Sequence, residues 1–300
     1  MHLVLGEPHD PLSAGVRDAL VARDRPVRII PSPIFGPLRF AWRLDASASR
    51  SILTFDDGLE LPAADIAGVF VGSVTGPDPV GWETPDLLYM YSEAHAAVLA
   101  WLWSLDCPVV NRADARTWYQ PNPPLLSWRR RLLEAGLPAM DALLTNVPEE
   151  ARAFARQGAT SGIDAIVFAP LTSQAGYIVA NDDEWEGITS LQRRMPVALT
   201  HPHGAAHFAC VVGDTVVWDP SAPPESRGLE SGLRAFAAGL GLTMVEVDFA
   251  SVDGGAAVIN VDPRPQLHHF GDAAIGIIEA IVDALTQDSR VPPREPVAVG

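Results

Sequence analysis

Three oxygen-bearing side chains near the end of the sequence have the types and spacing of cation ligands. Asp248 lies in the apolar segment 244–249, and Asn260 and Asp262 lie at the end of a second apolar segment, 256–261, after an Asp-Gly-Gly turn. The two segments predict a β-hairpin, in which Asn260 and Asp262 share one strand face because they are two residues apart. Such oxygens suit a hard cation such as Mg²⁺. Solvated polar residues at strand ends are the competing interpretation.

If a divalent ion binds, Asp248 and Asp262 are its expected ligands, because they are interpreted as the only carboxylates at adjacent strand ends of this hairpin. Histidines provide an alternative metal site, since imidazole and carboxylate groups suit zinc or iron. The candidates are His201, His203 and His207 in the segment HPHGAAHF, and His268 and His269 after the hairpin. Ordinary surface or core histidines are the competing interpretation, and Pro202 interrupts any regular strand there.

The charged residues exclude one class of partner and one class of chemistry. The formal net charge is −16, and the only basic run is Arg129-Arg130-Arg131, so nucleic acid is not an expected partner. All 21 basic residues are arginine, and the chain contains no lysine. It therefore has no lysine ammonium for a Schiff base or a phosphate contact, and arginine is not an equivalent replacement.

The length and composition predict a globular protein of two compact domains. The chain has 300 residues, of which 48% are hydrophobic. It contains no long uncharged apolar run and no signal-peptide pattern at the N-terminus, so a cytoplasmic protein without a membrane partner is expected. Cys107 and Cys210 are flanked by apolar residues and are expected to be buried thiols.

The first third of the chain alternates between predicted strands and helices, which favours a mainly parallel sheet. Strands are expected at 2–5, 27–30, 66–71 and 108–111, helices at 14–22 and 93–105, and an antiparallel pair at 39–44 and 51–55. Gly6 is not part of a phosphate loop, because no glycine-rich motif follows it.

The remainder predicts a second α/β unit after a proline-broken segment at 115–126. Ser127 is expected to cap a helix over 128–135, followed by a strand at 142–145, a helix at 149–157 and strands at 163–169 and 176–180. The acidic stretch 181–186 is expected to be a loop. A strand at 197–200, a hairpin at 209–218, a helix at 229–240, the hairpin described above and a helix at 273–285 complete the prediction.

These elements resemble the ATP-grasp fold of ATP-dependent carboxylate–amine ligases. The end of the sequence carries the resemblance, with a strand ending in V-D, a Gly-Gly turn and then V-I-N-V-D-P-R-P before a helix. The segments LTFDDGLELPAADIAGVFVG and CPVVNRADA resemble the small N-terminal domain of ligases that modify ribosomally made peptides. The resemblance implies an N-terminal α/β domain at 1–113, an ATP-grasp domain of two α+β lobes at 114–287 that meet near 197–208, and a tail at 288–300 without predicted order.

Several positions depart from the residues that the resemblance implies for ATP and Mg²⁺. Ala169 stands where a phosphate-contacting lysine is usual, and Leu199 and Thr200 stand where a Gln-Glu pair contacts adenine. Gly72 and Phe208 each stand where an arginine is usual. Asn260 stands where a glutamate is usual, and Asp262 stands where an asparagine is usual. Arg129, Arg130 or Arg131 could approach the phosphates from a helix start, although such a run more commonly forms a solvated helix face.

Two functions follow from this pattern. The favoured hypothesis is a non-catalytic protein that binds a peptide or a partner protein in a biosynthetic pathway and needs no cofactor. Lost charge-assisted contacts of about 1.5–3 kcal/mol each would weaken ATP binding roughly a thousandfold. The alternative is an active peptide ligase that uses ATP and Mg²⁺ on a small-molecule or peptide carboxylate. The sequence leaves a homodimer open in either case.

Overall fold

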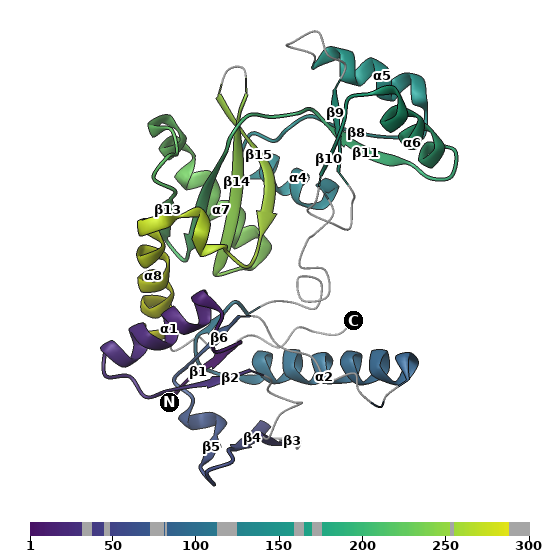
Figure 1. The fold of residues 1–300 in the computed structure, drawn as a ribbon. Coiled ribbons are helices and arrows are strands. Elements are labelled where there is room, and N and C mark those ends of the chain that lie inside the picture. The colour runs from purple at the N-terminus through teal and green to yellow at the C-terminus, as the bar shows by residue number, and fades with distance from the viewer. Residues whose placement is uncertain are drawn as a thin grey trace, which may run out of the picture.

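The structure is a computed structural model that describes residues 1–31, 38–44, 49–72, 81, 83–112, 125–158, 165–169, 176–252 and 255–287. These residues form an α/β protein with four separate sheets (Figure 1). The predicted domain boundary at 113–114 and the predicted tail at 288–300 lie outside the described residues. No described helix is long and apolar enough to cross a membrane.

The N-terminal sheet is parallel throughout, as the alternation of elements predicted. Its strand order is β2-β1-β6-β7, with β1 at His2–Leu5, β2 at Val27–Ile30, β6 at Gly68–Val71 and β7 at Val109–Val110. Helices α1 (Pro11–Ala22) and α2 (Thr84–Ser104) connect these strands. Helix α2 begins well before the predicted residue 93, because Pro85 occupies its first turn, where a missing N–H costs no hydrogen bond.

A small antiparallel sheet packs beside α2. It contains β3 (Arg39–Leu44), β4 (Ser49–Thr54) and β5 (Glu60–Pro62), and the short helix η1 (Ala63–Asp65) returns the chain to β6. The indole of Trp101 on α2 donates a 2.9 Å hydrogen bond to Ser51 Oγ inside this core. Leu53 and Trp101 are each 1% exposed, so the antiparallel pair and α2 share one apolar interior.

The first lobe has an antiparallel sheet with the order β10-β9-β11-β8. The strands are β8 (Ala142–Thr145), β9 (Ile166–Phe168), β10 (Tyr177–Val179) and β11 (Val197–Thr200), and the helices are α5 (Pro148–Gln157) and α6 (Asp182–Gln192). Apolar side chains of both helices pack on Val197 and Leu199 of β11. One face of the sheet is thus the helix-covered core of the lobe.

The expected acidic loop at 181–186 is wrong, because this stretch starts α6. Asn181 accepts a hydrogen bond from the Glu184 amide, and Glu184 accepts in return from the amides of Ala180 and Asn181. This reciprocal capping, together with the favourable position of acidic residues at a helix N-terminus, explains the helix. Trp185 is 3% exposed and anchors α6 to the sheet.

Replacing the cap should destabilise the first lobe measurably. Asn181→Ala removes the side-chain acceptor of the Glu184 amide and is expected to lower the free energy of unfolding by about 1 kcal/mol. Urea denaturation followed by circular dichroism measures the change. Asp183→Ala is the control, because it removes an acidic first-turn residue but no described capping hydrogen bond, and it should cost less stability than Asn181→Ala. An equal loss in both variants would contradict the assigned cap.

The second lobe has the strand order β13-β12-β14-β15. The strands are β12 (Ala206–Val212), β13 (Thr215–Trp218), β14 (Met244–Val252) and β15 (Gly255–Asp262); α4 (Leu125–Glu134), η2 (Pro224–Leu229) and α7 (Glu230–Leu240) belong to the same lobe. Helix α4 begins at Leu125, so Ser127 lies inside the helix and not at its cap as predicted. The chain passes between the lobes from β11 to β12, within the predicted range 197–208.

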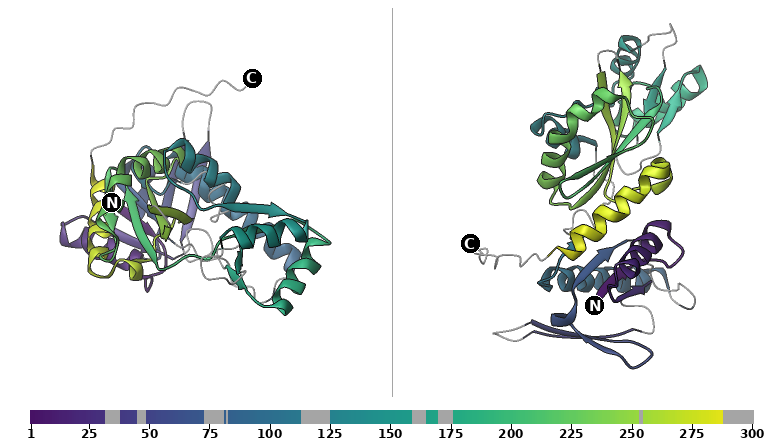
Figure 2. Two further views of the ribbon diagram at one scale, coloured as in Figure 1. Left: turned by 90° about the horizontal axis from the view of Figure 1, so that it is seen from above. Right: turned by 90° about the vertical axis from the view of Figure 1, so that its left-hand side faces the viewer.

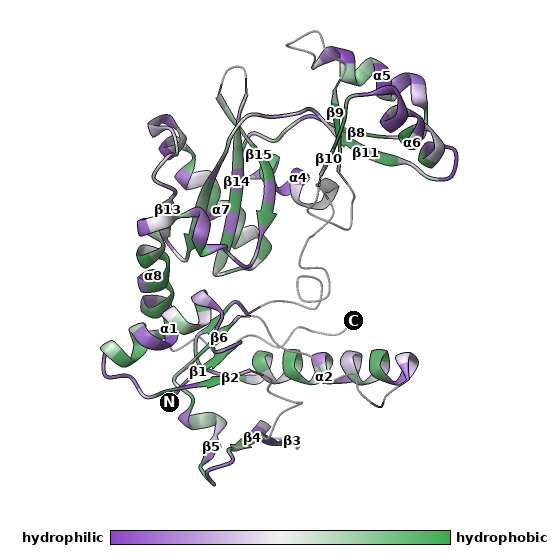
Figure 3. Ribbon diagram, viewed as in Figure 1, coloured by the Kyte–Doolittle hydropathy of each residue, from purple (hydrophilic) through white to green (hydrophobic). Residues whose placement is uncertain are grey.

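Helix α8 (Ala274–Thr286) joins the second lobe to the N-terminal sheet, after the short helices η3 (Leu267–His269) and η4 (Gly271–Ala273). Figure 2 shows α8 between these two parts of the molecule, and Figure 3 shows its largely hydrophobic colouring. One continuous core contains Val4 and Phe70 from the N-terminal sheet, Val212 from the second lobe, and Ile277 and Ile281 from α8. Helix α8 therefore contributes a large part of the apolar packing between these two parts.

Candidate functional site

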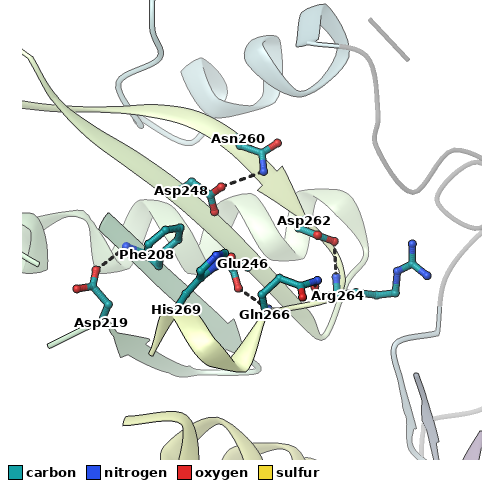
Figure 4. A network of polar contacts seen from close by, with 9 residues as sticks. All are labelled: Phe208, Asp219, Glu246, Asp248, Asn260, Asp262, Arg264, Gln266 and His269. Atoms are coloured by element: carbon teal, nitrogen blue, oxygen red, sulfur yellow. Dashed lines mark hydrogen bonds and ion pairs between the residues drawn. The ribbon is translucent and has the colours of Figure 1, made fainter. Parts of the chain in front are cut away.

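The candidate site lies on one face of β14 and β15, where polar side chains interrupt an otherwise apolar sheet. Asp248 pairs with Asn260 across the hairpin, and Glu246 pairs with Asp262. Because all four residues are two apart on their strands, they share one face. Val245 and Val247 point to the opposite face, into the core with α7 and α4. The structure thus brings together the three predicted oxygen ligands, Asp248, Asn260 and Asp262, and adds Glu246 (Figure 4).

The side chains on this sheet face change in character along β14. Val212 and Met244, at one end of β12 and β14, pack into the core around α8. Glu246 and Asp248 follow farther along β14, where η3 and the chain after β15 approach the sheet. The local sequence of β14 thus changes from apolar at Met244, in the core around α8, to acidic at Glu246 and Asp248.

Glu246 is the functional candidate that sequence reasoning missed. The prediction that Asp248 and Asp262 are the only carboxylates at adjacent strand ends of this hairpin is wrong, since Glu246 lies directly opposite Asp262. Asp248 is also not at a strand end, because β14 continues to Val252. The signal was present in the sequence, because Glu246 precedes Asp248 by two residues and a strand period of two places both on one face.

The contacts of Glu246 are made with the chain that follows the hairpin. Glu246 is 1% exposed, and its Oε2 accepts a 2.7 Å hydrogen bond from the Gln266 amide. Its Oε1 lies 2.7 Å from Nδ1 of His269. The imidazole of His269 stacks on Phe208 of β12, with 3.9 Å between ring centroids and 13° between planes. Glu246 therefore holds η3 against the sheet.

The other carboxylates have fewer donors. Asp248 Oδ2 accepts from Asn260 Nδ2 at 2.9 Å, but Asp248 Oδ1 is buried without a hydrogen-bond partner among the described residues. Asp262 Oδ1 accepts from the Arg264 amide at 2.8 Å, whereas the Arg264 guanidinium points away from the carboxylates in Figure 4. A buried acceptor without a donor is costly, so this face favours a proton or a cation.

The electrostatics of the site follow from burial and like charge. Burial, and then the negative charge of Asp248, raise the pKa of the Glu246 carboxyl to about 9. Burial also raises the pKa of Asp248, although the hydrogen bond from Asn260 acts in the opposite direction. Burial lowers the pKa of His269. These pKa shifts favour the protonated form of Glu246 and the neutral form of His269, so a hydrogen bond between uncharged groups is expected in their contact.

The raised pKa of Glu246 predicts a pH-dependent stability. The folded protein binds this proton more tightly than the unfolded chain, so the stabilisation is complete below the ordinary pKa of 4.5 and is lost as pH rises towards about 9. Glu246→Gln removes this titration. The unfolding free energy of the variant relative to the wild type should therefore increase with pH, by at most about 1.4 kcal/mol per pH unit in this range.

Urea denaturation of wild type and variant at several pH values measures that difference. Exposed Glu225 provides the control, because Glu225→Gln should give a difference that does not grow with pH. A Glu246→Gln variant whose stability follows the wild-type pH profile would show that Glu246 is ionised in the folded protein.

A second polar cluster adjoins the site through Phe208. The Phe208 amide donates a 2.6 Å hydrogen bond to Asp219 Oδ2, and Asp219 Oδ1 accepts from the amide and hydroxyl of Ser221. His207 Nδ1 lies 3.3 Å from Ser221 Oγ and 3.9 Å from Asp219. Because the same imidazole nitrogen faces both groups, the arrangement is not a serine-nucleophile relay, in which the two nitrogens have different partners.

The structure does not assemble the three histidines of the alternative metal site. His201 stacks on Phe154 of the first lobe at 4.1 Å, His203 contacts the Gly204 carbonyl, and His207 lies beside Ser221. Across the described residues, no group of three or more His, Cys, Asp and Glu side chains could hold a metal ion. We call the sheet face that carries Glu246, Asp248, Asn260 and Asp262 the carboxylate face. A cation bound there would need further oxygen ligands from water or from a bound ligand, and Mg²⁺ in proteins commonly keeps such ligands.

The residues that the resemblance implies as nucleotide contacts have no positively charged side chain among them. Ala169 follows β9, and its amide donates to the Ala198 carbonyl. Leu199 is fully buried and faces α5 and α6, whereas Thr200 lies on the opposite face of β11. Phe208 places an aromatic ring where the resemblance implies an arginine.

The arginines of α4 are also engaged elsewhere. Arg129 donates to the Met140 carbonyl, Arg130 pairs with Glu134 at 2.9 Å, and Arg131 donates to the Gly239 carbonyl. Helix α4 packs through Trp128 and Leu132 on the sheet face opposite the carboxylates. The structure therefore does not bring Arg129 or Arg131 to the carboxylate face. The described residues therefore place carboxylate and amide oxygens together on β14 and β15, but they form no group of three or more metal-ligating side chains, and the arginines of α4 offer no cation to phosphates there.

Comparisons with known proteins identify the fold. No family model and no curated protein matches the sequence. Among solved structures, the chain is similar to macrocyclase MdnC of Microcystis aeruginosa MRC, bound with precursor peptide MdnA. The identity is 15%, the match covers 95% of this chain and 98% of that chain, and the TM-score is 0.74.

Two further solved structures agree with this likeness. A RiPP-associated ATP-grasp ligase of Chryseobacterium gregarium, in complex with ADP and a leader and core peptide, is 12% identical with a TM-score of 0.73 over 96% of this chain and 97% of that chain. ATP-grasp ligase PsnB, complexed with a minimal precursor, is 19% identical with the same TM-score over 95% and 97%. Matches that cover 95% or more of this chain extend over the N-terminal sheet and both lobes.

Proposed function

We propose, from the premise that the chain has the ATP-grasp fold, that it is a non-catalytic peptide-binding protein of a peptide-modifying pathway. One observation carries the proposal: Ala169, Leu199 and Phe208 present no polar or cationic side chain at the positions where the resemblance implies contacts with a nucleotide. The solved structures of this fold named above include complexes with precursor peptides. These peptide complexes of proteins with the same fold support a peptide as the ligand of this chain.

Selection of short peptides from a phage-displayed library tests the proposal. Enriched peptides, made synthetically, should bind in calorimetry with an affinity that ATP and Mg²⁺ do not change. Mass spectrometry of the same mixtures should show an unmodified peptide and no ADP. Asp262→Asn, on the carboxylate face, should alter the affinity, and Asp18→Asn, on an exposed part of α1, should leave it unchanged. ADP release together with loss of water from a peptide would overturn the non-catalytic assignment.

The carboxylate face favours a second candidate, an active ligase with a divalent cation and ATP. Asp248 and Asp262 place carboxylate oxygens, which Mg²⁺ prefers, on one sheet face with Asn260, and PsnB has been crystallised with Mg and ADP. When bound, such a cation would neutralise charge on a transferring phosphoryl group. Calorimetry with Mg²⁺ or Mn²⁺ alone tests the cation site. The Asp248→Ala/Asp262→Ala double variant should abolish any heat of binding, and undiminished binding would place the ion elsewhere.

A further inference from the structure

Asn111 connects the N-terminal sheet to the start of the candidate site. It directly follows β7, and its side chain is buried, with 6% of the residue exposed. Asn111 Oδ1 accepts a 2.6 Å hydrogen bond from the Met244 amide, and Nδ2 donates to the carbonyls of Met244 at 2.7 Å and Pro263 at 3.0 Å. All three bonds cross from the N-terminal sheet to the second lobe.

The amide of Asn111 takes the place of a missing strand residue. The register pairs Glu246 with Asp262, so an uninterrupted β15 would place Arg264 opposite Met244. The chain instead leaves the sheet after Asp262, and the Arg264 amide turns to Asp262 Oδ1. A primary amide carries both a donor and an acceptor, so Asn111 can satisfy the N–H and C=O of Met244 as a neighbouring strand would.

We propose that Asn111 is a positioning residue of the carboxylate face. Its bonds to Met244 and Pro263 determine where β15 leaves the sheet. That departure point keeps Asp262 opposite Glu246 and directs the amides of Arg264 and Gln266 to the two carboxylates. The site is thereby coupled to the N-terminal sheet by three hydrogen bonds of one side chain. This inference concerns the geometry of the site and holds for either function proposed above.

Hydrogen–deuterium exchange of the full chain tests the coupling. Asn111→Ala removes all three bonds, and the nearly isosteric Asn111→Asp keeps an acceptor for the Met244 amide but loses both donors. In both variants, the amides of Arg264 and Gln266 should exchange at least about tenfold faster relative to the amides of β1. The Asn111→Asp variant keeps the test decisive if Asn111→Ala fails to fold.

Ser51→Ala is the matched control, because Ser51 is also buried and hydrogen-bonded but lies in the core beside α2. This variant should accelerate exchange only through global unfolding, measured separately in urea, and should not single out Arg264 and Gln266. If exchange at these two amides in the Asn111 variants rises only in proportion to the loss of global stability, Asn111 is an ordinary core residue and the proposal is overturned.

Discussion

Millimolar ATP with Mg²⁺ is expected to leave the melting temperature of the wild-type protein unchanged in a thermal-shift assay. A ligand present at a hundred times its dissociation constant would stabilise the protein by about 2.7 kcal/mol, a readily measured shift. Ala169 presents no cation to phosphates, and the buried Leu199 presents no polar side chain to adenine. The net charge of −16 adds repulsion of a polyanion, although salt screens it beyond about 8 Å.

A gain-of-function variant makes this prediction specific. Ala169→Lys should restore one phosphate contact without removing the backbone hydrogen bond between Ala169 and Ala198. ATP should then raise the melting temperature of this variant, and Ala41→Lys, on an exposed strand of the small antiparallel sheet, should behave as wild type. A wild-type dissociation constant in the tens of micromolar would contradict the prediction and show that other groups bind the phosphates.

Ile281→Ala should destabilise the protein by about 2–5 kcal/mol, the usual cost of truncating a fully buried isoleucine. Ile281 is 0% exposed and lies in the core that α8 shares with the N-terminal sheet and the second lobe. The cavity that this truncation leaves would border both the N-terminal sheet and the second lobe, so the unfolding transitions of both parts should move to lower urea concentration together. Urea denaturation followed by tryptophan fluorescence and circular dichroism measures the shift.

The same helix provides the control for this prediction. Ile275 is 62% exposed, so Ile275→Ala should change the free energy of unfolding by no more than about 0.5 kcal/mol. Two separate transitions in the Ile281→Ala variant, with only the second lobe destabilised, would show that α8 does not link the two parts energetically.

The two proposed functions differ in what they ask of the same sheet face. An active ligase needs cations opposite the carboxylates Glu246, Asp248 and Asp262, to hold phosphates there. The guanidinium groups of Arg129 and Arg131 instead bind backbone carbonyls, and the Arg264 guanidinium points away from the carboxylates (Figure 4). A peptide-binding protein needs only the scaffold and a complementary surface. The distribution of positive charge is therefore the main physical difference between the two hypotheses.

Local sequence patterns determined most of the elements and the fold class. Two apolar segments on either side of an Asp-Gly-Gly turn located the hairpin of β14 and β15, and amphipathic helical spacing located α8. The element order also predicted two lobes that meet between β11 and β12. The capping pair Asn181 and Glu184 was equally local, and the acidic composition of the stretch concealed it.

Tertiary structure alone decided which of the chemical groups meet. Strand period places Glu246 on the face of Asp248, but only the cross-strand register shows that Glu246 faces Asp262 and that His269 closes over it. The arginines of α4 are adjacent in sequence, yet packing of Trp128 and Leu132 commits that helix to the opposite face of the sheet. Burial then decides the charge of Glu246, because the pKa of a carboxyl depends on solvent and neighbouring charges that no local pattern specifies.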